Sequence, residues 1–114
     1  MSARAAVVLR DERRVALIRH LRDGHTCFDF PGGDIQAGEQ PADTAVREAR
    51  EELGVRVVLG PRLLIEELRG ETTHYFSAVA VAGDYDADTV WMEIAELPHY
   101  DVRPRALATI LMGG

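Results

Sequence analysis

Three glutamates, Glu48, Glu51 and Glu52, are the residues of this 114-residue chain whose types and spacing best suit chemistry. Glu51 and Glu52 follow Glu48 by three and four positions, so all three share about a 100° sector of a predicted helix over residues 41–53. Like charges at these spacings repel by roughly 0.2–0.5 kcal/mol per pair. A divalent cation would remove the repulsion, because hard cations such as Mg²⁺ prefer oxygen ligands.

The helix that positions these carboxylates begins at Pro41, a favoured first helical residue, and ends before Gly54, where a glycine cap is common. Arg47 and Arg50 are predicted to point away from the glutamates. Most glutamate-rich helices are solvated surfaces, so three glutamates alone do not establish a site. The apolar side chains expected on the buried stripe are Ala42, Ala45, Val46, Ala49 and Leu53.

The spacing of a longer stretch separates a functional cluster from a solvated surface. Residues 33–55 resemble the signature of the Nudix hydrolase family (MutT-like), G-x5-E-x7-R-E-U-x-E-E-x-G-U, where U is aliphatic, and Pro31 and Gly32 before it also match. Ala49 is smaller than the usual aliphatic residue at its position. The fixed positions are filled by Gly33, Glu39, Arg47, Glu48, Glu51, Glu52 and Gly54.

The resemblance implies an α/β fold, the Nudix α/β/α sandwich with a mixed β-sheet between helices, formed by a single domain over residues 1–114. The pattern of apolar runs and turns agrees with alternating strands and two helices. The expected strands are residues 3–9, 15–20, 26–30, 55–59, 63–68, 74–81 and 90–94, and a second helix covers 104–112.

The resemblance also implies a metal site that uses Mg²⁺, for which Mn²⁺ can substitute. Its predicted ligands are the Gly33 carbonyl, Glu48, Glu51 and Glu52. Glu48 and Glu52, one helical turn apart, are the pair expected to hold one ion. Glu51 could hold a second ion or contact the attacking water.

The predicted catalytic residues are Glu51, Glu48 and Arg47. The resemblance makes either Glu48 or Glu51 the general base, and some family members use a later acid. Arg47 is expected to act by pairing with an acidic neighbour, such as Glu39, and so fixing the loop before the helix. The later acids are Asp84, Asp86, Asp88 and Glu93, of which Asp88 and Glu93 rank first, although solvated surface roles are more common for such residues.

The substrate is predicted to be a nucleotide, contacted by Gly32, Phe28 and Tyr75. Aromatic rings suit bases, and paired glycines let the main chain approach a phosphate. The expected reaction is cleavage of a phosphoanhydride in a nucleoside triphosphate or another nucleoside diphosphate-linked compound, releasing a nucleoside monophosphate. Two alternatives are an ADP-ribose or dinucleoside polyphosphate hydrolase, whose usual downstream proline or tyrosine is absent here, and a catalytically silent Nudix domain that senses nucleotides.

Composition restricts the partners and the compartment. The net charge of −6 argues against a nucleic-acid partner, and any side chain that binds phosphate by charge must be arginine, because the chain has no lysine. A single cysteine, Cys27, predicts a cytoplasmic protein, and no signal peptide or membrane-spanning run is visible. A homodimer is possible, because a chain of this size carries exposed strand edges.

Overall fold

Strand β1 (Ser2–Asp11) is central to the computed structural model, which describes residues 2–113. Most of β1 pairs in parallel with β6 (Glu71–Gly83), and its last two residues pair antiparallel with β2 (Arg14–Arg22). The strand order is β5-β6-β1-β2-β3-β8, with β4 on β1 and β7 on β2. The remaining strands are β3 (His25–Asp29), β4 (Gly32–Asp34), β5 (Val55–Leu68), β7 (Val90–Glu93) and β8 (Val102–Arg103).

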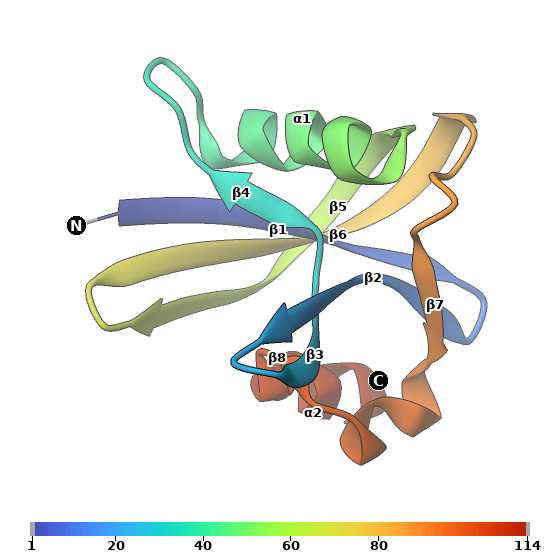
Figure 1. Cartoon of the computed structure of the whole chain (residues 1–114). Helices are drawn as coiled ribbons and strands as arrows, with labels where there is room; N and C mark the ends of the chain where they lie inside the picture. The colour runs from blue at the N-terminus through green and yellow to red at the C-terminus, as the bar shows by residue number, and fades with distance from the viewer. Residues whose placement is uncertain (1, 114) are drawn as a thin grey trace.

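Helices cover both faces of the sheet (Figure 1). Helix α1 (Pro41–Leu53) packs on the face that carries Ala5, Val7 and Leu9. The 3₁₀ helix η1 (Ile94–His99) and α2 (Arg105–Gly113) pack with the opposite face of β1, which carries Ala6 and Val8. This double coverage explains why five consecutive residues of β1 are buried. The predicted mixed sheet between helices is confirmed.

Helix α1 begins and ends where its sequence predicted. The Gln40 main-chain N–H donates to the Asp43 carboxylate at 2.9 Å in the first turn. Gly54 has a φ of 78°, and its N–H donates to the Arg50 carbonyl, which is the left-handed cap that glycine favours. Ala42 was wrongly assigned to the buried stripe: it lies at the flank of the stripe and is exposed, whereas Thr44 is buried.

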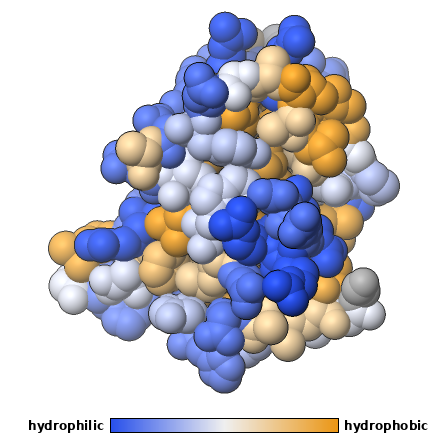
Figure 2. Space-filling view, turned by 90° about the vertical axis from the view of Figure 1, so that its right-hand side faces the viewer, coloured by the Kyte–Doolittle hydropathy of each residue, from blue (hydrophilic) through white to orange (hydrophobic). Residues whose placement is uncertain are grey.

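Strand β5 is continuous, although Gly60 and Pro61 predicted a break. Register shifts against β6 between Leu59 and Leu64 accommodate these two residues. A proline is tolerated because β5 is the sheet edge, where a missing N–H removes no ladder bond. Figure 2 views the side where β6 ends and shows apolar side chains in its upper part and a hydrophilic cluster below them. Among residues 2–113, no helix is long and apolar enough to cross a membrane.

Candidate functional site

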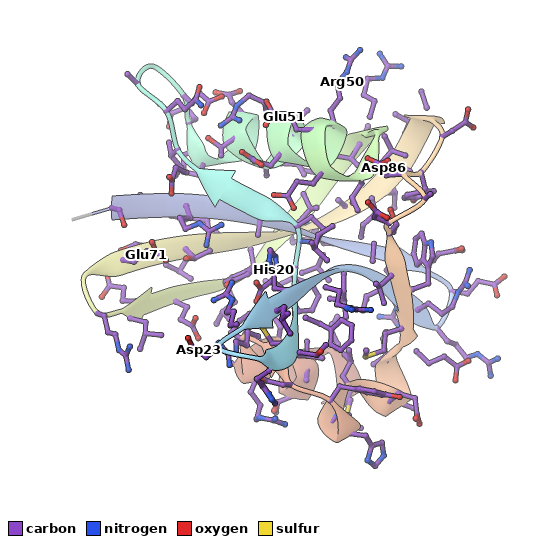
Figure 3. All side chains as sticks on the ribbon, in the orientation of Figure 1. His20, Asp23, Arg50, Glu51, Glu71 and Asp86 are labelled. Carbon is purple, nitrogen blue, oxygen red and sulfur yellow. The ribbon has the colours of Figure 1, made fainter. Side chains whose placement is uncertain are left out.

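Arg47 organises the acidic cluster of α1. Its Nε donates to Glu39 Oε2 at 2.8 Å and its Nη2 to Glu39 Oε1 at 3.0 Å. Its Nη1 lies 2.9 Å from Glu48 Oε1 and 3.2 Å from Glu51 Oε2, and its Nη2 also contacts the Asp34 carbonyl. The prediction that Arg47 points away from the glutamates was wrong, because its long side chain folds back along the helix. Arg50 does point away from the sheet (Figure 3).

Glu39 ties the loop before α1 to the helix. Besides Arg47, its carboxylate accepts hydrogen bonds from the Gln36 N–H at 2.9 Å and the Thr44 hydroxyl at 2.8 Å. These donors, with the Arg47 guanidinium first, hold the pKa of Glu39 at about 2. The burial of Thr44 is thereby explained, because its hydroxyl has a charged acceptor. The pairing of Arg47 with an acidic neighbour is therefore present in the structure.

Glu52 and Glu48 lie one helical turn apart on α1, close enough for the charge of Glu48 to act on Glu52. Burial raises the pKa of Glu52 to about 7, and the neighbouring Glu48 carboxylate adds to this. The Arg4 guanidinium and a hydrogen bond with the Gly32 backbone act in the opposite direction. Glu52 is therefore harder to ionise than a solvent-exposed glutamate, as expected when two carboxylates lie close together.

Gly33 leaves room for the Glu48 carboxylate. A Cβ at Gly33 would collide with the carboxylate of Glu48 and push this flexible side chain aside, so the glycine lets the carboxylate lie against β4. Gly32 has a different constraint, because a Cβ there would collide with the Ala5 carbonyl and the Ala6 side chain on β1. The two glycines thus bring β4 against both the helix carboxylate and the central strand.

A cavity of about 530 Å³ lies beside this cluster and has both acidic and basic lining. Four of the residues predicted to bind metal or substrate line it: Gly32, Gly33, Glu52 and Tyr75. Phe28 does not, since it packs against the core and meets Tyr100 edge to face at 5.9 Å. The charged lining comprises Arg4, His20, Arg22, Asp29, Glu52, Glu66, Arg69, Glu71, Arg103 and Arg105.

The distribution of these charges was not predicted. Five arginines of the thirteen in the chain line this one cavity, although the whole chain is acidic. Figure 3 shows His20 on β2 and Glu71 at the start of β6, both below α1, which carries Glu51. Glu66 of β5 also lines the cavity, whereas the later acids ranked first by sequence, Asp88 and Glu93, do not.

The acidic cluster of α1 can offer a divalent ion a pair of carboxylates, Glu48 and Glu52, but not a complete set of ligands. Within residues 2–113, no three acidic, histidine or cysteine side chains are grouped so that they could hold an ion. Arg47 engages Glu48 and Glu51, and Glu52 lies one helical turn beyond Glu48. One or two carboxylates are what Mg²⁺ usually takes when substrate phosphates supply further ligands.

Comparisons with known proteins agree with the fold and the cluster. A family model described as NUDIX domain matches residues 1–110, so the chain belongs to the Nudix hydrolase family. It is 30% identical over 106 residues to an ADP-sugar pyrophosphatase of Mus musculus, covering 80% of this chain and 48% of that protein. It is 33% identical over 51 residues to an 8-oxo-dGTP diphosphatase of Escherichia coli K12, covering 43% of this chain and 40% of that protein.

The chain spans about half the length of the curated relatives it matches. Among solved structures, a NUDIX hydrolase from Nitrosomonas europaea superposes with a TM-score of 0.80 at 18% identity, covering 97% of this chain and 86% of that one. This likeness supports the fold, which carries many chemistries, and leaves function to the site.

Proposed function

We propose that this chain is a Mg²⁺-dependent pyrophosphohydrolase that cleaves a phosphoanhydride in a nucleoside triphosphate or another nucleoside diphosphate-linked compound, releasing a nucleoside monophosphate. The observation that carries the proposal is the close approach of the Glu48 carboxylate to Gly33, beside a cavity lined by Glu52 and five arginines. The names of the two curated relatives, an ADP-sugar pyrophosphatase and an 8-oxo-dGTP diphosphatase, support this substrate class.

Glu48, Glu52 and the Gly33 carbonyl would hold the metal ion, and Glu51 would hold a second ion or contact the attacking water. When bound, a divalent ion neutralises phosphate oxygens and lowers the pKa of a bound water. Mn²⁺, which also takes carboxylate and carbonyl ligands, can substitute for Mg²⁺. The fit rests on the Glu48–Glu52 pair and on the space that Gly33 leaves for Glu48.

The side chains of the chain itself orient the reactants. Arg47 fixes Glu48 and Glu51 through its Nη1, so its catalytic role is that of a positioning residue. Arg4, whose charge acts on Glu52, is placed to contact a phosphate at the same end of the cavity. The general base is proposed to be Glu48 or Glu51, and Glu66 is a third acid that faces the cavity.

Two other functions remain as alternatives. Hydrolysis of an ADP-sugar is favoured by the name of the mouse relative, which aligns with most of this chain. A silent nucleotide sensor is less favoured, because a protein that only binds nucleotides has no need of the complete acid cluster.

The proposal is tested by incubating the full chain with Mg²⁺ and a panel of nucleoside triphosphates and nucleoside diphosphate-linked sugars, with identification of products. Glu52→Gln should lower the rate on the order of 10²-fold, while the matched Glu96→Gln, on the exposed surface of η1, should leave it unchanged. Undiminished hydrolysis by Glu52→Gln, or tight nucleotide binding without any product, would contradict the proposed reaction.

A cytoplasmic location and a homodimer stay predictions. The first rests on the single cysteine, Cys27, which is buried. The second has a surface available, because β5 is a sheet edge and Val58, Val79 and Val81 are about half exposed. Sedimentation velocity would show whether the chain is a monomer.

A further inference from the structure

One wall of the cavity is made by a short parallel pairing between β3 and β8. Asp29 and Arg103 are register partners in this pairing, as are Phe28 and Val102. Phe28 and Val102 pack into the core. Since side chains alternate along strands, Asp29 and Arg103 project from the opposite face, and both line the cavity. A carboxylate and a guanidinium therefore stand side by side on this wall.

Asp29 lines the cavity and, within the part of the chain that the structure describes, has one carboxylate oxygen without a side-chain partner. Arg22 Nη2 lies 2.6 Å from Oδ2, and His20 Nε2 lies 3.3 Å from the same atom. Among the described residues, no side chain hydrogen bonds to Oδ1. The Asp29 side chain is 21% exposed, so Oδ1 is an available acceptor with two lone pairs.

Hydrogen bonds to Asp101 orient the guanidinium of Arg103 and leave one of its NH₂ groups for a ligand. Its Nε and Nη2 donate to the two oxygens of Asp101 at 3.1 and 3.0 Å. Asp101 is in turn fixed by His25 Nε2 at 2.9 Å. Among residues 2–113, no side chain accepts from Nη1. Arg103 thus offers a positioned NH₂ group on the same wall of the cavity as the Asp29 carboxylate.

We propose that Asp29 and Arg103 read the edge of a guanine base, and that the nucleotide substrate of this chain is a guanine nucleotide. The inference rests on the proposed function, because the base belongs to the nucleotide whose phosphates lie at the Glu52 end. The Watson–Crick edge of guanine presents the N1–H and N2–H donors beside the O6 acceptor. Asp29 accepts from the two donors, and Arg103 donates to O6.

The other bases match this wall less well. Adenine and cytosine place a single amino donor beside an acceptor, so one bond to Asp29 is lost. Uracil and thymine flank their one donor with carbonyl oxygens, which would face the carboxylate of Asp29 and be repelled. Tyr75 and Phe30, which meet edge to face in the core, also contribute to the cavity lining, so an aromatic edge lies at its floor.

The test measures binding of GMP, IMP and AMP to the metal-free full chain by calorimetry. IMP differs from GMP only by lacking the 2-amino group, and AMP also lacks O6. GMP should bind on the order of tenfold more tightly than IMP, because the carboxylate of Asp29 accepts a hydrogen bond from the 2-amino group that IMP lacks. AMP should bind more weakly still. Equal affinities for GMP and IMP would overturn the proposal without any variant.

Variants then assign the two contacts. Asp29→Ala should bring the GMP and IMP affinities together, and Arg103→Gln should weaken GMP and IMP but not AMP. Asp11→Ala is the matched control, because Asp11 also pairs with an arginine, Arg14 at 3.1 Å, but lies outside the cavity. A uniform loss for all three ligands in Asp29→Ala would place this residue on the ribose or phosphate and refute base reading.

The same experiments separate the two proposals. If GMP is preferred over IMP but no nucleotide is hydrolysed with Mg²⁺, base reading stands and the proposed hydrolysis fails. If triphosphates are hydrolysed with no preference among bases, the hydrolase stands and base reading by Asp29 and Arg103 is refuted.

Discussion

Replacing Glu52 by glutamine should stabilise the metal-free protein while abolishing its response to Mg²⁺. The pKa of Glu52 is raised from 4.5 to about 7, so the folded state keeps a proton that the unfolded state releases. Stability therefore falls as the pH rises through this interval. The shift corresponds to roughly 3 kcal/mol, and solvent screening of this partly buried group reduces it to about 1–2 kcal/mol. Glutamine imitates the protonated form and removes this cost.

The assay is thermal unfolding of wild type and Glu52→Gln at several pH values, with EDTA and then with Mg²⁺. In EDTA above pH 7, the variant should melt several degrees higher, since 1 kcal/mol shifts the midpoint of a chain of this size by about 3–6 °C. Below pH 4.5 the difference should vanish, because both proteins are then neutral at this position. Added Mg²⁺ should raise the midpoint of wild type only.

Glu51→Gln is the control, because Glu51 is 56% exposed and pairs with Arg47 rather than with another carboxylate. It should give no such gain in EDTA. The reasoning is refuted if Glu52→Gln is no more stable than wild type at alkaline pH, or if its gain does not depend on pH. A Mg²⁺-induced rise that survives in Glu52→Gln would remove this residue from the metal ligands.

Two further predictions concern the neighbouring backbone and loop. Gly33→Ala should fold but lose the Mg²⁺-induced rise in melting temperature, because the new methyl group displaces the Glu48 carboxylate. Gly32→Ala should instead lose on the order of 1–3 kcal/mol of stability by collision with β1. Equal melting temperatures of the two variants in EDTA would contradict this contrast. Glu39→Gln should expose residues 35–40 to proteolysis. Its loss of stability relative to wild type should shrink as the pH falls from 4.5 toward 2, where wild-type Glu39 also protonates. A loss that is constant across this pH range would show that the charge of Glu39 is unimportant.

The sequence was sufficient to predict the bounds of helix α1 and the acidic residues that this helix carries. Local rules placed Pro41 at its start and Gly54 at its end, and the spacing of the glutamates requires only the helical repeat. The same rules failed for Arg47, because the helical repeat predicts the direction of a Cβ and not the reach of a long side chain. Its partner Glu39 lies in a loop, whose conformation the spacing does not encode.

The basic wall of the cavity had no comparable local pattern. Its position depends on a two-residue parallel pairing that joins Asp29 to Arg103, which are far apart in the chain. Strand β8 is too short to show the alternation by which strands are recognised. Asp101 and Arg103, two residues apart on a polar segment, were the available indication, and such spacings are frequent on ordinary surfaces.

The acids and the wall come from different parts of the chain, and this separation has an evolutionary consequence. The carboxylates and glycines lie within one continuous segment, whereas the wall combines the β2–β3 hairpin with the segment that leads into α2. Substitutions in the second group can alter which ligand is accepted while the first group retains its arrangement. A lineage built on this scaffold can therefore acquire new selectivity by drift at a few peripheral positions, with its reaction machinery inherited intact.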